Sequence, residues 1–272
     1  MQPRSVLAIC LAAAGCSAPA QGAPAPAPAK RVVLVELYTS QGCSSCPPAD
    51  AFVRALPALG VGRDKVIPLT FHVDYWDRLG WKDPFANPKF TQRQERYARA
   101  GKLRSPDGAG GLDGLYTPQM IVDGTVHFSG QRRQTALAEI ERAAARPPAL
   151  ELVAEAAVRG ATVEVTVRAS ARGDGKRDLD WRLVGVLTAK KARTAVAHGE
   201  NGGETLDEVS VVRALSERIP IPPAPRAPLT VRLDKPADLA WADVELVVFA
   251  QSEATGEIGA VQAFDAGRLA AR

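Results

Sequence analysis

The stretch GCSSCPPAD, residues 42–50, decides how the chain is interpreted. It places Cys43 and Cys46 two residues apart, after the apolar run VVLVELY (32–38) and before two prolines. A cysteine pair with this spacing can be a redox-active disulfide, half of a metal site or a small structural disulfide. The spacing alone does not separate these three interpretations, so the rest of the chain has to.

The composition is that of an ordinary globular protein with a mild excess of positive charge. The chain has 272 residues, of which 46% are hydrophobic and 24% charged, and this length fits one large domain or two modest ones. Its 34 basic residues are nearly balanced by 30 acidic ones, which gives a net charge of +4. Because the basic residues are scattered and not interleaved with aromatic ones, we expect no nucleic-acid partner.

The first 30 residues predict export. Residues 1–22 contain an apolar run followed by small residues, the layout of a signal peptide, and the run falls short of the about 20 apolar residues that a membrane-spanning helix needs. Two outcomes stay open: AAGC resembles a bacterial lipobox, which would lipidate Cys16, while cleavage after an A-x-A sequence would release a soluble protein. Residues 23–30 are an Ala/Pro linker. The expected location is the bacterial periplasm or, for a lipoprotein, the outer membrane, with a lipid anchor as the only membrane contact.

Export leaves two cysteines in the folded part. Cys10 departs with the signal peptide, and Cys16 is either removed or lipidated, so Cys43 and Cys46 remain. A disulfide between them closes a very small loop and adds little stability on the chain-entropy model. This favours a reactive pair over a structural one.

Residues 31–146 show alternating strand and helix patterns. Buried strands are predicted at RVVLVELYT (31–39) and KVIPLTFHVDYW (65–76), and a strand, a turn and a strand at TPQMIVDGTVHFSG (117–130). Helices are predicted between and after them, at 46–59, 87–102 and 134–145. This order is typical of a layered α/β domain.

Beyond the Pro-rich segment ARPPA (145–149) the pattern changes to period two. ATVEVTVRAS (161–170) alternates, while WRLVGVLTA (181–189) and VELVVFAQS (244–252) are apolar runs between turn residues. We therefore predict that residues 149–272 form an all-β, sandwich-like domain.

The position of the cysteine pair favours thiol chemistry. At a strand–helix junction, Cys43 would lie at the helix N-terminus, where the helix dipole stabilises a thiolate. Cys46, one turn further, would be the buried thiol that resolves a mixed disulfide. Ser44 and Ser45 could cap the first turn or donate to the thiolate.

With these features in place, residues 31–146 resemble the thioredoxin superfamily. The resemblance implies a fold class, an α/β thioredoxin-like domain followed by the all-β sandwich-like domain. It also implies that Pro118, in YTPQMIVDG, is a cis-proline facing a Cys43–Cys46 disulfide, and that Thr117 offers its backbone to a substrate. Glu36, in the first strand, would be the buried acid that moves the proton of the buried thiol. A carboxylate at the strand edge is the alternative for Glu36, and an ordinary trans-proline for Pro118.

More narrowly, the chain resembles the DUF1223 family of secreted thioredoxin-like proteins. The resemblance is carried by VELYTSQGCSSCPPAD (35–50), HVDYWDRLGWKDPFA (72–86) and HGENGGETLDEVSVVR (198–213). It implies a fold but no substrate. The Gly-rich third segment could reach back to the cysteines, with Glu200 and Asn201 controlling access, or could be a plain hairpin loop.

Two residues expected near the cysteine pair each allow a functional and a structural interpretation. Trp76, at the end of the second strand, could be a platform for a peptide substrate or part of a packed loop. His72 could join Cys43 and Cys46 as a ligand of Cu(I) or zinc, or be a hydrogen-bonded histidine at a strand end.

The sequence as a whole predicts an exported thiol–disulfide oxidoreductase that acts on envelope proteins through Cys43 and Cys46 and needs no cofactor. One alternative is a metallochaperone-like protein that binds copper or zinc at the pair. A second is a non-catalytic binding module whose disulfide is structural. The direction of electron flow is not predicted.

Overall fold

The computed structural model describes most of the chain beyond its first 30 residues. The predicted signal peptide, the linker and Cys16 lie outside the described residues, which are 31–106, 115–172, 180–223 and 227–271. Within 31–146 the predicted order of strands and helices is confirmed.

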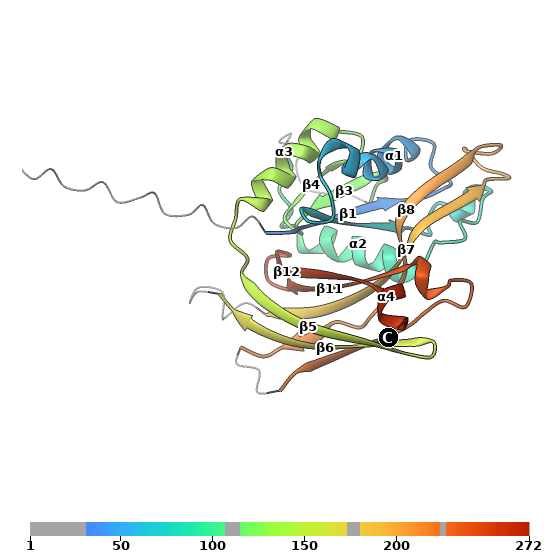
Figure 1. Ribbon diagram of the computed structural model, residues 1–272. Coiled ribbons are helices and arrows are strands. Elements are labelled where there is room, and N and C mark those ends of the chain that lie inside the picture. Colours follow the sequence, from blue (N-terminus) through green and yellow to red (C-terminus); the bar gives the residue numbers. More distant parts are fainter. Residues whose placement is uncertain (1–30, 107–114, 173–179, 224–226, 272) are drawn as a thin grey trace, which may run out of the picture.

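The elements of this first half alternate along the chain (Figure 1). They are β1 Val33–Thr39, α1 Pro47–Ala55, η1 Leu56–Leu59, β2 Val66–His72, η2 Asp77–Leu79, α2 Pro88–Ala100, β3 Gln119–Val122, β4 Val126–Ser129 and α3 Arg133–Ala144. Helix α2 shows how locally the sequence sets the ends: the Asn87 side chain accepts from the Lys89 amide, and Gly101 ends the helix with φ of 60°.

The second half consists mainly of strands. Its elements are β5 Leu150–Arg159, β6 Thr162–Ala171, β7 Trp181–Ala195, β8 Thr205–Leu215, β9 Ile219–Ile221, β10 Leu229–Asp234, η4 Trp241–Asp243, β11 Val244–Ser252, β12 Ile258–Asp265 and α4 Ala266–Ala270. Across the described residues, strands therefore hold about twice as many residues as helices.

One mixed sheet runs through both halves. Its order is β12-β11-β7-β8-β2-β1-β3-β4, with β9 also paired to β7. Strand β1 is parallel to β2, and β2 is parallel to β8 from the second half, through the pair Thr70 and Val211. Strands β10, β6 and β5 form a separate antiparallel sheet.

The predicted fold class is therefore wrong. The chain is not an α/β thioredoxin-like domain followed by a separate β-sandwich, because β7, β8, β11 and β12 extend the sheet of the first half. The physical reason lies in β7 and β11, whose apolar runs are buried on both faces, as is typical of central strands in a covered sheet. Strands β5, β6 and β10 alternate as one-sided strands do. The division at residues 146–149 into domains stays a prediction.

Three cores hold the layers together. Helices α1 and α3 cover one face of the sheet around β1 and β3, and α2 covers the opposite face (Figure 1). On β7, Leu183 and Leu187 face the three-stranded sheet, whereas Val184 and Val186 face the core that contains Phe90 of α2. The second half thus completes the core under the first.

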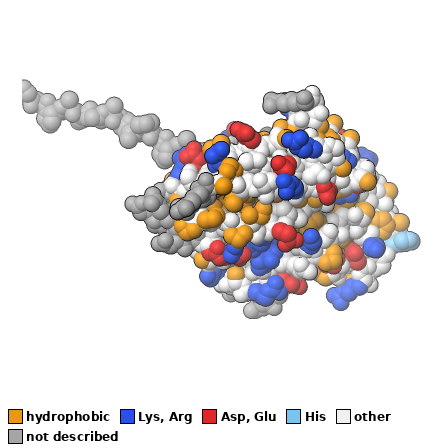
Figure 2. Space-filling view, turned by 90° about the horizontal axis from the view of Figure 1, so that it is seen from below, with side chains coloured by type: hydrophobic (Ala, Val, Ile, Leu, Met, Phe, Trp, Pro, Cys, Tyr) orange, Lys and Arg blue, Asp and Glu red, His pale blue; other side chains and the backbone are white. Residues whose placement is uncertain are grey.

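On the face drawn in Figure 2, Lys and Arg side chains are intermixed with Asp and Glu, so this face shows no large patch of one sign of charge. Among the described helices, none combines the length and apolar character needed to cross a membrane.

Candidate redox site

The cysteine pair forms a disulfide at the N-terminus of α1. Cys43 and Cys46 are bonded, with their Cα atoms 5.5 Å apart. Cys46, and not Cys43 as predicted, is the N-cap residue of α1, and Pro47 and Pro48 occupy the first two helical positions. Since prolines have no N–H and the amides of Ala49 and Asp50 donate to the Cys46 carbonyl, few helix amides are left for a thiolate. The Ser45 hydroxyl, 3.2 Å from Cys43 Sγ, is the polar group placed at that sulfur.

The disulfide is covered although its loop lies at the surface. Cys43 and Cys46 are both 0% exposed, whereas the two serines between them are exposed. A covered disulfide is protected from thiols in solution until something moves.

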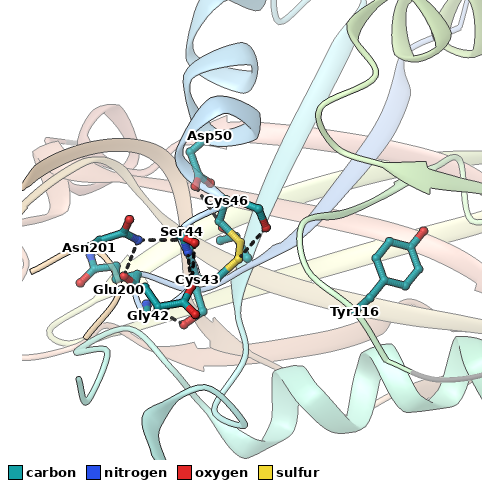
Figure 3. Close-up of a disulfide and its surroundings, with 12 residues drawn as sticks. Gly42, Cys43, Ser44, Cys46, Asp50, Tyr116, Glu200 and Asn201 are labelled. Atoms are coloured by element: carbon teal, nitrogen blue, oxygen red, sulfur yellow. Dashed lines mark hydrogen bonds between the residues drawn. A yellow bond between two sulfur atoms is a disulfide. The ribbon is translucent and has the colours of Figure 1, made fainter. Parts of the chain in front are cut away.

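The cysteine loop contacts the tip of the β7–β8 hairpin, residues 197–203, which we call the hairpin tip. Glu200 Oε2 accepts from the Ser44 amide at 2.8 Å and from its hydroxyl at 2.7 Å, and Asn201 Nδ2 donates to the carbonyls of Gln41 and Cys43 at 2.8 and 3.0 Å. Figure 3 shows both side chains beside the cysteine loop. The predicted approach of this segment to the cysteines is confirmed, whereas control of access stays a prediction.

The predicted proline and tryptophan also lie near the pair. The Thr117–Pro118 peptide is cis, as predicted. Gly130 lies between Pro118 and Ala49 of α1, since a Cβ at Gly130 would be 3.3 Å from Pro118 Cβ and 2.9 Å from Ala49 Cβ. Trp76 packs against the cysteine loop, with its Cβ 3.4 Å from the Cβ position of Gly42. Their roles toward a substrate stay predictions.

Glu36 does not lie at the disulfide. It is 1% exposed and forms an ion pair with Arg93, whose Nε and Nη2 lie 2.7 and 2.9 Å from its carboxylate oxygens. The hydroxyls of Tyr38 and Tyr97 also donate to it. In β1, Leu34 and Tyr38 share its face, whereas Val35 and Leu37 face α1. The predicted proton transfer by Glu36 is corrected on this ground: the carboxylate points to the core of α2, away from α1.

The carboxyl group on the side of the disulfide is Asp50. It lies four residues after Cys46, one helical turn along the same face of α1, and Figure 3 shows it next to Cys46. Its Oδ2 accepts from the Thr39 hydroxyl at 3.0 Å, and its Oδ1 has no hydrogen-bond partner within the described part of the chain. Burial, followed by the charge of Glu208, raises the pKa of Asp50 to about 7.

A buried polar cluster lies behind Asp50. His72 Nδ1 is 2.7 Å from Asp83 and its Nε2 is 3.5 Å from Glu208. Burial alone would lower the pKa of His72, but Asp83 and then Glu208 outweigh it and raise the pKa to about 9. The imidazole is therefore charged at neutral pH. Gln41 connects the two carboxylates: its backbone N–H donates to Asp83, and its side-chain Nε2 donates to Glu208.

This cluster bears on the metal alternative. A metal ligand needs a neutral imidazole nitrogen, yet both nitrogens of His72 face carboxylates and its pKa is raised to about 9. His72 does not fit as a third ligand beside Cys43 and Cys46. Throughout the described residues, no group of three or more His, Cys, Asp or Glu side chains is arranged to hold a metal ion.

Two functional candidates were missed from the sequence. In the sequence, Asp50 has the position of an ordinary acidic residue in the first turn of a helix. Only its spacing of four residues from Cys46 indicates a role at the cysteine pair. Glu208 sits in a strand 165 residues along from Cys43 (208 − 43), so nothing local could place it there.

The comparisons with known proteins agree with the sequence motifs. The family described as protein of unknown function (DUF1223) matches residues 34–251. The chain belongs to the DUF1223 family. Among curated proteins, none matches it.

Two solved structures share the fold of this DUF1223 chain. A crystal structure of a protein from Agrobacterium tumefaciens is 25% identical, with a TM-score of 0.62 over 86% of this chain and 95% of that one. HBP35 of Porphyromonas gingivalis is 12% identical, with a TM-score of 0.63 over 89% of this chain and 77% of that one. The second likeness extends to the fold alone.

Proposed function

We propose that this DUF1223 protein is an exported thiol–disulfide oxidoreductase that exchanges disulfides with other proteins of the bacterial envelope. The observation that carries the proposal is Asp50, a buried carboxyl group one helical turn behind Cys46 with one oxygen unpaired among the described residues. Burying an ionisable group costs free energy of folding. A disulfide that only braces the fold has no use for such a group, whereas a thiol that gains and loses a proton does.

The reaction is a two-step exchange. A thiolate of a substrate dithiol attacks Cys43 Sγ, the Cys43–Cys46 bond breaks, and Cys46 leaves as a thiolate that takes up a proton. The second substrate thiolate then attacks the substrate sulfur of the mixed disulfide and releases Cys43. The substrate is oxidised by two electrons, which reduce the protein disulfide to two thiols. In the reverse direction the same steps reduce a substrate disulfide.

The protonated carboxyl group suits the first of these steps. With a pKa of about 7, Asp50 is present in both protonation states near neutral pH and can give a proton to the leaving Cys46 thiolate or accept one from its thiol. In this proposal Asp50 takes the role that the sequence had assigned to Glu36. Thr117, Pro118 and Trp76 remain the proposed substrate-positioning residues.

A structural disulfide in a binding module is the second candidate. The observation that favours it is the complete burial of Cys43 and Cys46, because structural disulfides are inert when no thiol can reach them. The two candidates differ in one respect: only the oxidoreductase must open.

Mixed-disulfide trapping tests the proposal. Cys46→Ser should form a covalent adduct with an unfolded protein that carries a disulfide, because the Cys43 thiolate attacks that disulfide, one substrate cysteine leaves as a thiol, and the thiol that would resolve the mixed disulfide is missing. Cys43→Ser is the matched control and should form far less adduct. If neither variant forms an adduct, and the reduced wild-type protein also fails to reduce the disulfide of the same substrate, a structural disulfide is the better account.

Export is a separate part of the proposal and rests on the sequence of residues 1–30. Fractionation of cells that express the full chain should place the protein in the envelope. Cys16→Ala should abolish labelling with a radioactive fatty acid if Cys16 is lipidated, and should change nothing if the protein is released as a soluble form.

A further inference from the structure

The cysteine loop and the hairpin tip lie in different halves of the chain but are joined directly by hydrogen bonds. All four hydrogen bonds from Glu200 and Asn201 end on residues 41–44, the segment that carries the first cysteine. Three of them involve main-chain groups: the carbonyls of Gln41 and Cys43 and the amide of Ser44. The tip therefore satisfies the backbone of the cysteine loop whatever the side chains of that loop are.

The two contacts differ in how strongly water competes with them. Asn201 is 6% exposed, and its amide group is shielded from solvent. Glu200 is exposed, so its hydrogen bonds to Ser44 are made at the surface, where water can replace them. The Ser44 amide, followed by its hydroxyl, lowers the pKa of Glu200, which stays charged at neutral pH. Contact at the Glu200 edge is the easier one to break.

The backbone of the tip suits a segment that changes conformation. Gly199 and Gly203 lie on either side of Glu200 and Asn201, with φ of 77° and 91°, in the left-handed region that glycine enters without cost. Within the described part of the chain, no atom lies within 4 Å of the Cβ position of Gly203. Beyond the tip the hairpin is fixed, since Val196 and Glu204 pair through their backbones.

We propose that the hairpin tip is a removable cover over the Cys43–Cys46 disulfide, anchored by Asn201 and held at its exposed edge by Glu200. This inference rests on the proposed function, because a cover has a purpose only over a disulfide that reacts. The occupant that displaces the tip is an extended polypeptide segment, since such a segment offers the N–H and C=O groups that residues 41–44 would lose. The tip thus keeps the disulfide closed to small thiols and opens it to a protein substrate.

The rate of reduction by tris(2-carboxyethyl)phosphine measures the cover directly. This small phosphine becomes a phosphine oxide as the disulfide gains two electrons and becomes two thiols. The rate is compared in native buffer and in concentrated guanidinium chloride, where the disulfide is exposed. Three variants are compared with the wild type: Glu200→Gln, replacement of residues 197–203 by an Asn-Gly turn, and the control Glu204→Gln on the same loop.

The cover predicts a large difference between the folded and unfolded wild-type protein, with reduction at least about a hundredfold slower when folded. Glu200→Gln should accelerate reduction of the folded protein about tenfold, the shortened tip should accelerate it further, and Glu204→Gln should leave it unchanged. The proposal would be overturned if the folded wild type, Glu200→Gln and the shortened-tip variant were all reduced at the same rate. This comparison requires that both variants retain the near-ultraviolet circular dichroism of the wild type. If the shortened variant does not fold, the wild type and Glu200→Gln decide.

The equilibrium reduction potential of the same proteins separates this inference from the proposed function. Faster reduction of the variants together with the very low potential of a structural disulfide would support the cover and overturn the oxidoreductase. Unchanged rates with the potential of a catalytic disulfide would overturn the cover and support the oxidoreductase.

Discussion

Asp50 and Glu36 are both buried acids, and their surroundings give them different tasks. Glu36 accepts hydrogen bonds from Arg93 and two tyrosines, so its negative charge is fully compensated. Asp50 accepts one hydrogen bond, from Thr39, and burial raises its pKa to about 7. A carboxyl group whose pKa lies near neutral pH can both give and accept a proton there and is suited to proton transfer.

The first prediction concerns the pH dependence of stability. In the folded protein Asp50 has a pKa of about 7, above the value of about 3.9 for an unfolded chain. Between these values the folded state binds the extra proton, so the contribution of Asp50 to stability decreases as pH rises and is constant above pH 7. Asp50→Asn lacks this ionisation. Its stability relative to the wild type should increase by about 1.4 kcal/mol per pH unit between about pH 5 and 6, and by less as the pH approaches 7, which urea denaturation at several pH values measures.

The same variant should react more slowly. Without the carboxyl group, Asp50→Asn should lose about tenfold or more in the rate of disulfide exchange near neutral pH. A variant that is stabilised toward neutral pH and unchanged in exchange rate would show that Asp50 is only a buried acid with no part in the reaction.

At the scale of the strand, the alternation of side chains decides which acid meets the cysteines. Residues 34, 36 and 38 of β1 face the core of α2, and residues 35 and 37 face α1. Glu36→Gln should therefore reduce stability by about 3–5 kcal/mol, because it leaves the Arg93 guanidinium buried without its counter-charge. The pKa of the Cys46 thiol, followed by alkylation of the reduced protein at different pH values, should stay the same. A shift in the pKa of the Cys46 thiol would show that Glu36 does act on the cysteine pair.

The turn between β3 and β4 offers a second test at this scale. Gly124 has φ of 67°, and a Cβ there would lie 1.9 Å from the Gly256 carbonyl oxygen of the β11–β12 turn. Gly124→Ala should destabilise the protein by at least about 2 kcal/mol more than Gly101→Ala. The control Gly101 also has a positive φ, of 60°, but no atom of the described residues lies within 4 Å of its Cβ position. Equal losses of stability in the two variants, measured by thermal unfolding, would mean that the β3–β4 turn and the β11–β12 turn are not in tight contact.

At the scale of the whole molecule, the two halves share one sheet and one core. Tyr38 and Phe71 of the first half belong to the same buried cluster as Val184 and Phe249 of the second. A fragment of residues 31–148 would expose this cluster and the free edge of β2. We expect the fragment to lack a cooperative thermal transition and the full chain to unfold in a single one. A fragment with its own sharp transition would establish an independent domain.

The sequence predicts local features of this molecule well and long-range ones poorly. The element order of residues 31–146 followed from local patterns, and the disulfide and the cis peptide before Pro118 followed from the family resemblance that short motifs carry. The pairing of β2 with β8 did not, because a parallel partner far along the chain leaves no local pattern. The two-sided burial of β7 and β11 is visible in the sequence as unbroken apolar runs, but such runs occur in the core strands of a sandwich as well as in the central strands of a covered mixed sheet. The role proposed for Asp50 could be inferred only from its burial, which the hydrophobic pattern of α1 does not specify.

The equilibrium reduction potential of the Cys43–Cys46 pair tests the central claim most directly. It is measured by thiol trapping of the full chain across a series of dithiothreitol or glutathione buffers. The account predicts a value between about −120 and −270 mV, the range of catalytic disulfides, and its place in that range would indicate oxidant or reductant. A value below about −300 mV would mark a structural disulfide and contradict the account.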